Sequence, residues 1–146
     1  MIKRKGDLFS TDARAIGHGV NCQGVMGAGI AKVFKDKFPD NYVNYKRHCE
    51  LSTLVPGDVY VFERWGRDPH IFNIASQGAP GRHARYDWLF NGSLKAAQKA
   101  VRLDADVIAI PQIGCGIGGL EWDKVETLLL AIEVLVPDFQ WEVWKQ

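Results

Sequence analysis

Two glycine-rich segments are the part of this sequence best suited to hold a ligand. Eight of the 15 glycines fall within them, four in residues 18–30 and four in residues 113–120. Glycine lets a backbone approach an anion closely, and the free N–H groups at the start of a helix can bind phosphate. Each segment follows a strand-like run and precedes a helical one. A single loop of this kind is explained equally well as a tight turn. Two of them in one short chain predict a diphosphate held between them.

The second segment also contains a G-x-G-x-x-G pattern, formed by Gly114, Gly116 and Gly119. A dinucleotide-binding site of the dehydrogenase type would need an acidic residue after the next strand, about 20 residues later, to hold the ribose. The acidic residue near that distance, Glu133, falls inside a predicted helix. No glycine is followed by Lys-Ser or Lys-Thr, as a P-loop requires. The sequence therefore argues against both nucleotide-binding classes.

The elements that must position these segments alternate along the chain. Runs rich in β-branched and aromatic residues predict strands at 15–20, 59–63, 71–75, 107–111 and 140–144. Apolar residues at helical spacing predict helices at 30–38, closed by Pro39, at 87–103, and at 125–136, closed by Pro137. Alternating strands and helices predict an α/β fold, with a central sheet covered by helices on both faces.

Composition places the chain among ordinary globular proteins. It has 146 residues, 47% of them hydrophobic, and a formal net charge of +1. The apolar content excludes a disordered chain, and the near-neutral charge argues against general nucleic-acid binding. No apolar run is long enough to cross a membrane. Three cysteines without metal-ligand spacing fit a reduced protein, so we expect a cytoplasmic protein, with residues 1–146 as a single domain.

Three motifs in order resemble a known family. Gly6-Asp7-Leu8, the run from Asn21 to Ala31, and the run from Ile113 to Trp122 resemble successive signatures of macrodomains, the ADP-ribose-binding fold. The resemblance covers nearly the whole chain. It points to the branch that contains terminal ADP-ribose glycohydrolase, the DNA ADP-ribosyl antitoxin hydrolase and the yeast-type ADP-ribose 1″-phosphate phosphatase. It implies a three-layer α/β/α fold with a mixed central sheet.

The resemblance also implies a role for each matching position. Asp7 would accept a hydrogen bond from the adenine amino group, with Leu8 beside the ring, and Asn21 would reach the distal ribose. The remaining ligand-binding residues would enclose the diphosphate from two sides. They are Val25, Met26, Gly27, Ala28, Gly29 and Ile30 in the first segment, and Ile113, Gly114, Cys115, Gly116, Ile117 and Gly118 in the second.

Two positions depart from what the resemblance implies for catalysis. The lysine-dependent hydrolases of this branch carry a catalytic lysine just after the strand that matches 71–75, where this chain has Gln77. The glycohydrolases also carry an aspartate in the second glycine-rich loop, where this chain has Gly118. Because an amide cannot replace a nucleophilic lysine, we do not expect the lysyl mechanism.

Asn21 and His83 are the candidate catalytic residues. Asn21 could hold a ribose hydroxyl or orient a water molecule. His83 lies in a basic loop that the family's layout places near the distal ribose, where it could act as a general acid or base. Arg82 or Arg85 could hold a terminal phosphate there. A plain solvated loop is the alternative for His83, Arg82 and Arg85.

Other reactive residue types have simpler interpretations. His18 lies within a predicted strand and is expected to be a core residue. Asp87 is expected to cap the second predicted helix. Cys22 and Cys115 lie in the two glycine-rich segments, where a thiol nucleophile is conceivable, but packing is the favoured role. The histidines and cysteines do not group into a metal site, and no metal or cofactor is expected.

The sequence therefore predicts an ADP-ribose-binding protein that hydrolyses an ADP-ribose derivative, with ADP-ribose 1″-phosphate as the leading substrate. Two alternatives stay open. One is a reader that binds ADP-ribose without catalysis, and the other is a lysine-independent hydrolase of ADP-ribosylated protein or nucleic acid. We expect a monomer whose partner is the small ligand, without membrane association.

Overall fold

The computed structural model describes residues 1–67 and 69–146 and has a six-stranded mixed sheet at its centre. The strands are β1 (Ile2–Lys5), β2 (Ala15–Val20), β3 (Val59–Phe62), β4 (His70–Ala75), β5 (Val107–Ile110) and β6 (Gln140–Lys145). They lie in the order β1-β6-β5-β2-β4-β3. β3 runs antiparallel to β4, and the other neighbours are parallel.

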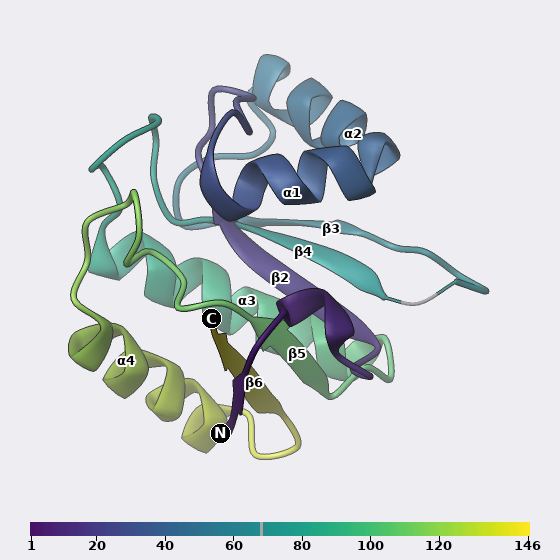
Figure 1. Cartoon of the computed structure of the whole chain (residues 1–146), viewed down its shortest axis with the longest axis vertical. Helices are drawn as coiled ribbons and strands as arrows, with labels where there is room; N and C mark the ends of the chain where they lie inside the picture. The colour runs from purple at the N-terminus through teal and green to yellow at the C-terminus, as the bar shows by residue number, and fades with distance from the viewer. Residues whose placement is uncertain (68) are drawn as a thin grey trace.

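Four helices cover the two faces of this sheet (Figure 1). On one face lie α1 (Gly29–Lys37) and α2 (Pro39–Glu50), and on the other lie α3 (Tyr86–Arg102) and α4 (Trp122–Leu135). A short 3-10 helix, η1 (Leu8–Ser10), follows β1. The predicted three-layer α/β/α architecture with a mixed sheet is confirmed. Among the described helices, none is long and apolar enough to span a membrane.

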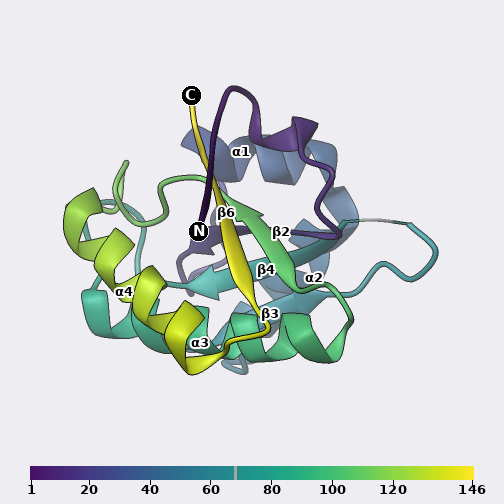
Figure 2. The same ribbon diagram turned by 90° about the horizontal axis from the view of Figure 1, so that it is seen from below.

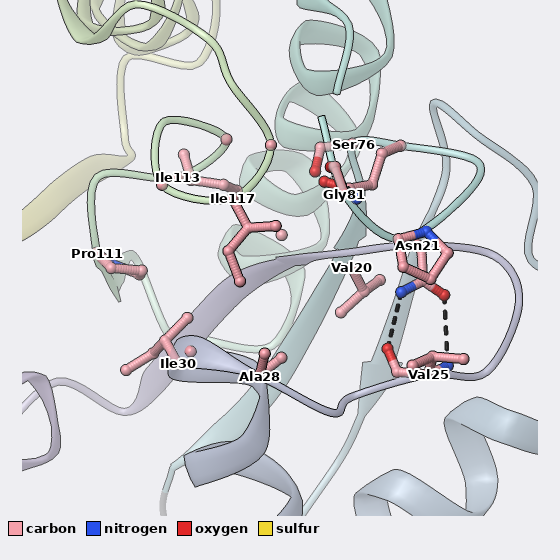
Figure 3. A pocket seen from close by; sticks show the side chains of 18 of the residues that line it. Val20, Asn21, Val25, Ala28, Ile30, Ser76, Gly81, Pro111, Ile113 and Ile117 are labelled. Carbon is pink, nitrogen blue, oxygen red and sulfur yellow. Dashed lines mark hydrogen bonds between the residues drawn. The ribbon is translucent and has the colours of Figure 1, made fainter. Parts of the chain in front are cut away.

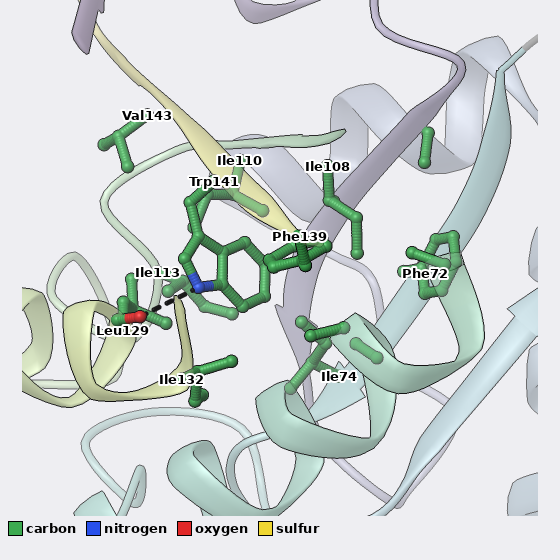
Figure 4. Close-up of a cluster of buried hydrophobic side chains, with 14 of the residues drawn as sticks. Phe72, Ile74, Ile108, Ile110, Ile113, Leu129, Ile132, Phe139, Trp141 and Val143 are labelled. Carbon is green, nitrogen blue, oxygen red and sulfur yellow. Dashed lines mark hydrogen bonds between the residues drawn. The ribbon is translucent and has the colours of Figure 1, made fainter. Parts of the chain in front are cut away.

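β4 shows why the sheet is buried on both faces. All six of its residues are buried, and successive side chains point to opposite sides. Phe72 and Ile74 pack into the cluster between the sheet and α3 and α4, where Trp141 donates a 3.1 Å hydrogen bond from Nε1 to the Leu129 carbonyl (Figure 4). Ile71 belongs to the cluster on the opposite face.

Three elements, η1, β1 and α2, were not predicted from the sequence. β1 has three exposed basic residues and no apolar alternation, and its backbone pairing with β6 defines it (Figure 2). Pro39, expected only to close a helix, begins α2. Proline fits the first position of a helix because the N–H it lacks would have no partner there.

Two details of the predicted helices are corrected. Asp87 is not the cap of α3; the cap position is Arg85, and Asp87 lies in the first turn, where it accepts hydrogen bonds from Arg85 and from the Trp88 N–H. A carboxylate is favourable there because the start of a helix carries partial positive charge. In α4 the predicted apolar stripe is buried at Val125, Leu129 and Ile132, but its end turns outward, and Leu135 is 59% exposed.

The topology gathers three loops at one edge of the sheet. β1, β6, β5, β2 and β4 all run in the same direction, so their carboxyl ends share that edge. The loops that follow β2, β5 and β4 contain residues 21–28, 111–121 and 76–85. In open α/β sheets, ligands bind in the crevice at the carboxyl ends of the strands.

Candidate functional site

A pocket of about 380 Å³ lies between these three loops (Figure 3). Eleven of the predicted binding residues line it: Asn21, Val25, Gly27, Ala28, Gly29, Ile30, Ile113, Gly114, Gly116, Ile117 and Gly118. Nine further residues line it that were not predicted to bind: Gly19, Val20, Ala31, Ser76, Gln77, Pro80, Gly81, Pro111 and Gln112. Most of these lie at strand ends or in the loop after β4.

The first glycine-rich loop is shaped by the side chain of Asn21. Its Oδ1 accepts hydrogen bonds from the backbone N–H groups of Gln23 (2.9 Å) and Val25 (3.4 Å), and its Nδ2 donates to the Val25 carbonyl (2.8 Å). The buried Tyr45 hydroxyl of α2 lies 3.1 Å from the same Oδ1 and donates to the Asn21 carbonyl at 2.7 Å. Asn21 therefore frames the loop, and its Nδ2 group uses one of its two hydrogens to do so.

This loop leads into α1, whose first backbone N–H groups are not capped by a side chain. α1 begins at Gly29, which has a φ of +59°. Its cap residue, Ala28, makes no side-chain cap hydrogen bond, so no side chain of the cap satisfies the first N–H groups of α1. Because Gly27 to Ala31 line the pocket, the positive end of α1 faces it. This arrangement favours an anion.

The second glycine-rich loop is held by apolar packing. Gly114 has a φ of +77°, and a Cβ there would lie 2.9 Å from Leu89 Cδ1 and 3.0 Å from Leu120 Cδ1. The Leu120 N–H closes the loop on the Gly114 carbonyl at 2.9 Å. Ile117 reaches across the pocket, with its Cδ1 3.4 Å from where a Gly29 Cβ would be. The two loops therefore form facing walls.

Two glycines in these walls are not required by the fold. A Cβ on Gly116 would meet nothing within 4 Å, and one on Gly27 would only reach ordinary contact with Val25 at 3.7 Å. Neither has a positive φ. Both line the pocket, so the space that they leave is pocket space, available to a ligand that approaches the backbone.

The loop after β4 forms a third wall. The Gln77 side chain donates from Nε2 to the carbonyls of Ala79 (2.6 Å) and Gly81 (3.1 Å). Ser76 lies at the start of this loop, fully buried, and its hydroxyl has no hydrogen-bond partner among the described residues. Basic residues made this loop a candidate from the sequence, but the residues of it that line the pocket are Ser76, Gln77, Pro80 and Gly81.

The described side chains that line the pocket are uncharged. Its polar side chains are Asn21, Ser76, Gln77 and Gln112, and among the described lining residues none is acidic, basic or a thiol. General acid–base catalysis by a lining side chain is therefore unsupported. Apart from these, Val25, Ile30 and Ile117 place exposed apolar surface around the pocket.

Five predicted site residues do not line the pocket. His83 is exposed in the loop after β4 and is not among the residues that line the pocket. Met26 and Leu8 are core residues. Asp7 is exposed and accepts a 3.0 Å hydrogen bond from the Phe9 N–H at the start of η1. Cys115 packs against the core, with its Sγ 3.4 Å from the Ile113 carbonyl.

The thiols are poor nucleophiles. Burial raises the pKa of Cys115 to about 11, and burial first, then nearby Cys49 and Asp58, raise the pKa of Cys22 to about 11. Both thiols are therefore protonated at neutral pH, whereas the reactive form is the thiolate. The structure agrees with packing as their role. No group of three or more histidine, cysteine or acidic side chains within the described chain is placed to hold a metal ion.

His18 lies in β2, just before the first glycine-rich loop, and is buried, as predicted. Its Nε2 is 2.8 Å from Asn73 Oδ1, and its ring stacks on Phe34 with centroids 3.8 Å apart. Asn73 in turn exchanges hydrogen bonds with Asn41 of α2 at 2.8 and 3.2 Å. Burial lowers the pKa of His18 to about 4, so its ring is neutral at pH 7.

Comparison with known proteins identifies the family. A Macro domain family model matches residues 18–129, so the chain belongs to the macrodomain family, as the motifs predicted. A DNA ADP-ribosyl glycohydrolase of Mycobacterium tuberculosis is 30% identical over 135 residues, which cover 91% of this chain and 38% of that protein. An ADP-ribose 1″-phosphate phosphatase of Meyerozyma guilliermondii is 27% identical over 163 residues, covering 90% of this chain and 93% of that protein.

A solved structure supports the same assignment. The macrodomain of Mycobacterium tuberculosis DarG superimposes with a TM-score of 0.89 at 30% identity, covering all of this chain and 98% of that one. The chain spans 34–38% of the length of the mycobacterial and Thermus aquaticus DNA ADP-ribosyl glycohydrolases. It therefore corresponds to the macrodomain part of those longer proteins.

Proposed function

We propose that the pocket binds ADP-ribose, with the diphosphate between the two glycine-rich loops. The observation that carries this proposal is the free space over Gly27 and Gly116, on facing walls, next to the open start of α1. Backbone N–H groups and a helix start hold phosphate without side-chain charge, which suits a lining that has none. The relatives named above act on ADP-ribosyl groups or an ADP-ribose phosphate.

The order of the strands sets the line along which a ligand would lie. Asp7 follows β1, at the same edge as the pocket but on the side of β6 and β5. The loop after β4 lies on the opposite side of β2. A ligand crossing the carboxyl ends of the strands would lie along this line, and the resemblance to the family implies adenine toward Asp7, the diphosphate between the glycine-rich loops, and the distal ribose near Asn21 and Gln77. Asp7 would contact only the adenine that extends beyond the pocket.

We further propose that the reaction is hydrolysis of ADP-ribose 1″-phosphate. A lining without an acid favours a leaving group that departs without prior protonation, and phosphate is such a group, whereas an alkoxide is not. Water attacks C1″, the bond from C1″ to the ester oxygen breaks, and the phosphate leaves with the electron pair and takes up the proton of the water. The free amide hydrogen of Asn21 can hold a ribose hydroxyl, but its occupied Oδ1 is not available as a base.

The same neutral lining favours a second candidate function, a reader that binds ADP-ribose without catalysis. Phosphate release separates the two. The full chain is incubated with ADP-ribose 1″-phosphate in heavy-oxygen water, and phosphate and ADP-ribose are quantified. Hydrolysis at C1″ releases phosphate without the heavy oxygen, whereas labelled phosphate contradicts the route through C1″. An intact substrate together with measurable ADP-ribose binding would leave the reader function.

A further inference from the structure

The loop after β4 lines the pocket through Ser76, Gln77, Pro80 and Gly81. We call residues 77–84 the distal loop. Gln77 and Ala84 at its ends form an antiparallel bridge. Its Gly78 carbonyl accepts a 3.3 Å hydrogen bond from the Cys22 N–H of the first glycine-rich loop. Its Ala84 N–H donates at 3.3 Å to the Gly118 carbonyl of the second. The distal loop is therefore tied to both other walls.

The Gln77 side chain fixes the middle of this loop. Its Nε2 donates to two carbonyls of the loop, Ala79 at 2.6 Å and Gly81 at 3.1 Å. Pro80 lies between these two acceptors, and both Pro80 and Gly81 line the pocket. Proline has a fixed φ, and two hydrogen bonds from one amide restrict the residues on either side of it. The wall thus has a defined shape before a ligand binds.

The second glycine-rich loop packs closely against Gln77 at Gly118. A Cβ on the buried Gly118 would lie 3.2 Å from Gln77 Oε1, 2.9 Å from Ala84 Cβ and 2.7 Å from the Gly114 carbonyl oxygen. Any side chain at position 118 would therefore push the second glycine-rich loop away from the distal loop. Glycine at 118 and glutamine at 77 together allow the two loops to meet.

We propose that the distal loop restricts this site to ADP-ribose derivatives that carry a small group at C1″, and that Gln77 is the positioning residue that maintains this restriction. The inference rests on the proposed function, which places the distal ribose beside this loop. A phosphate at C1″ would need little room beside three loops that are tied together at Gly78, Ala84 and Gln77. An ADP-ribose linked to a folded protein or to DNA would need these loops to separate.

Binding measurements test the restriction. Calorimetry compares ADP-ribose, ADP-ribose 1″-phosphate, an ADP-ribosylated DNA oligonucleotide and an ADP-ribosylated protein as ligands of the full chain. We expect the two small ligands to bind with similar affinity and both conjugates to bind at least about tenfold more weakly. Equal affinity for conjugates and small ligands would overturn the inference and leave the proposed function standing. If the folded protein binds none of the four, the proposed function itself fails.

Substitutions at Gln77 test the positioning role. Gln77→Met keeps the length of the side chain and removes both donors, and Gln77→Ala removes the side chain. We expect both variants to lose hydrogen-exchange protection in residues 78–84 and to reduce the preference for small ligands by about threefold or more. Gln98→Ala, on α3 outside the pocket, is the matched control and should retain the preference. If Gln77→Met keeps the full preference and protection, Gln77 does not act through its hydrogen bonds.

Discussion

The two glycine-rich loops form facing walls of one pocket, yet different forces hold them in place. The first depends on polar groups, since Asn21 bonds its own loop and the Tyr45 hydroxyl of α2. The second depends on apolar contact, since Gly114 lies against Leu89 and Leu120. The polar wall should respond to the loss of single hydroxyls, whereas the apolar wall should respond to added volume.

The comparison also separates two uses of glycine within one loop. Gly114 is needed for folding, because its φ is positive and side chains surround it. Gly116, two residues later, has no such constraint and leaves room in the pocket. The same residue type therefore serves folding at one position and leaves pocket space open two residues later, and matched substitutions can distinguish the two uses.

The largest expected effect is at Gly114. Gly114→Val would impose a β-branched residue at a positive φ and overfill the space beside Leu89 and Leu120. We expect the free energy of unfolding to fall by about 3 kcal/mol, the sum of backbone strain and overpacking. Denaturant titration measures it. Gly116→Val is the matched control, and an equal loss of stability in both variants would refute the distinction between the two glycines.

The next effect concerns pH and the buried His18. His18 has a pKa of about 4 in the folded protein against an ordinary value of 6.5, so between these values the unfolded chain binds a proton that the folded chain does not. The contribution to stability is complete above pH 6.5 and is lost as the pH falls toward 4. We expect about 2 kcal/mol less stability at pH 5 than at pH 7 from this group.

Unfolding at a series of pH values checks this expectation. His18→Leu should be less stable than the wild type at pH 7, because it loses the bond to Asn73, but it should show a shallower decline between pH 6.5 and 4. His83→Gln, an exposed histidine in the distal loop, should keep the wild-type slope. If His18→Leu declines as steeply as the wild type, burial of His18 is not the source of the pH dependence.

A smaller effect is expected from a single hydroxyl. Tyr45→Phe removes the 2.7 Å bond to the buried Asn21 carbonyl and should reduce the free energy of unfolding by about 1 kcal/mol. Tyr42→Phe, which loses a 3.0 Å bond to the Gly24 carbonyl in the same loop but is only partly buried, should cost less. Hydrogen exchange should increase in residues 21–28 and not in residues 113–120. Faster exchange in the second loop would show that the two walls are not held independently.

Much of the fold could be predicted from residue patterns, because β2, β4 and β5 are buried on both faces and read as apolar runs. β1 and α2 could not. β1 is polar and exists through pairing with β6, which lies at the other end of the chain. In α2, a proline that ends one helix also begins the next, and the sequence alone does not distinguish the two uses.

The candidate site, like the fold, has features that could be predicted from the sequence and features that could not. Most of the backbone positions that line the pocket could be predicted, because glycine clusters between a strand and a helix are local signals. The role of Gln77 could not, because its partners become evident only when the distal loop folds back on itself. His83 has the residue type of a catalyst, but its side chain lies outside the pocket lining. Chemical type alone does not indicate which way a loop residue faces.

Calorimetric titration of ADP-ribose into the wild type and Gly116→Val tests the central claim most directly. The account predicts that the wild type binds and that Gly116→Val, with unchanged unfolding, loses at least about tenfold in affinity, or about 1.4 kcal/mol, because the valine fills pocket space that the fold does not use. Equal affinity in the two proteins would contradict the placement of the diphosphate between the glycine-rich loops.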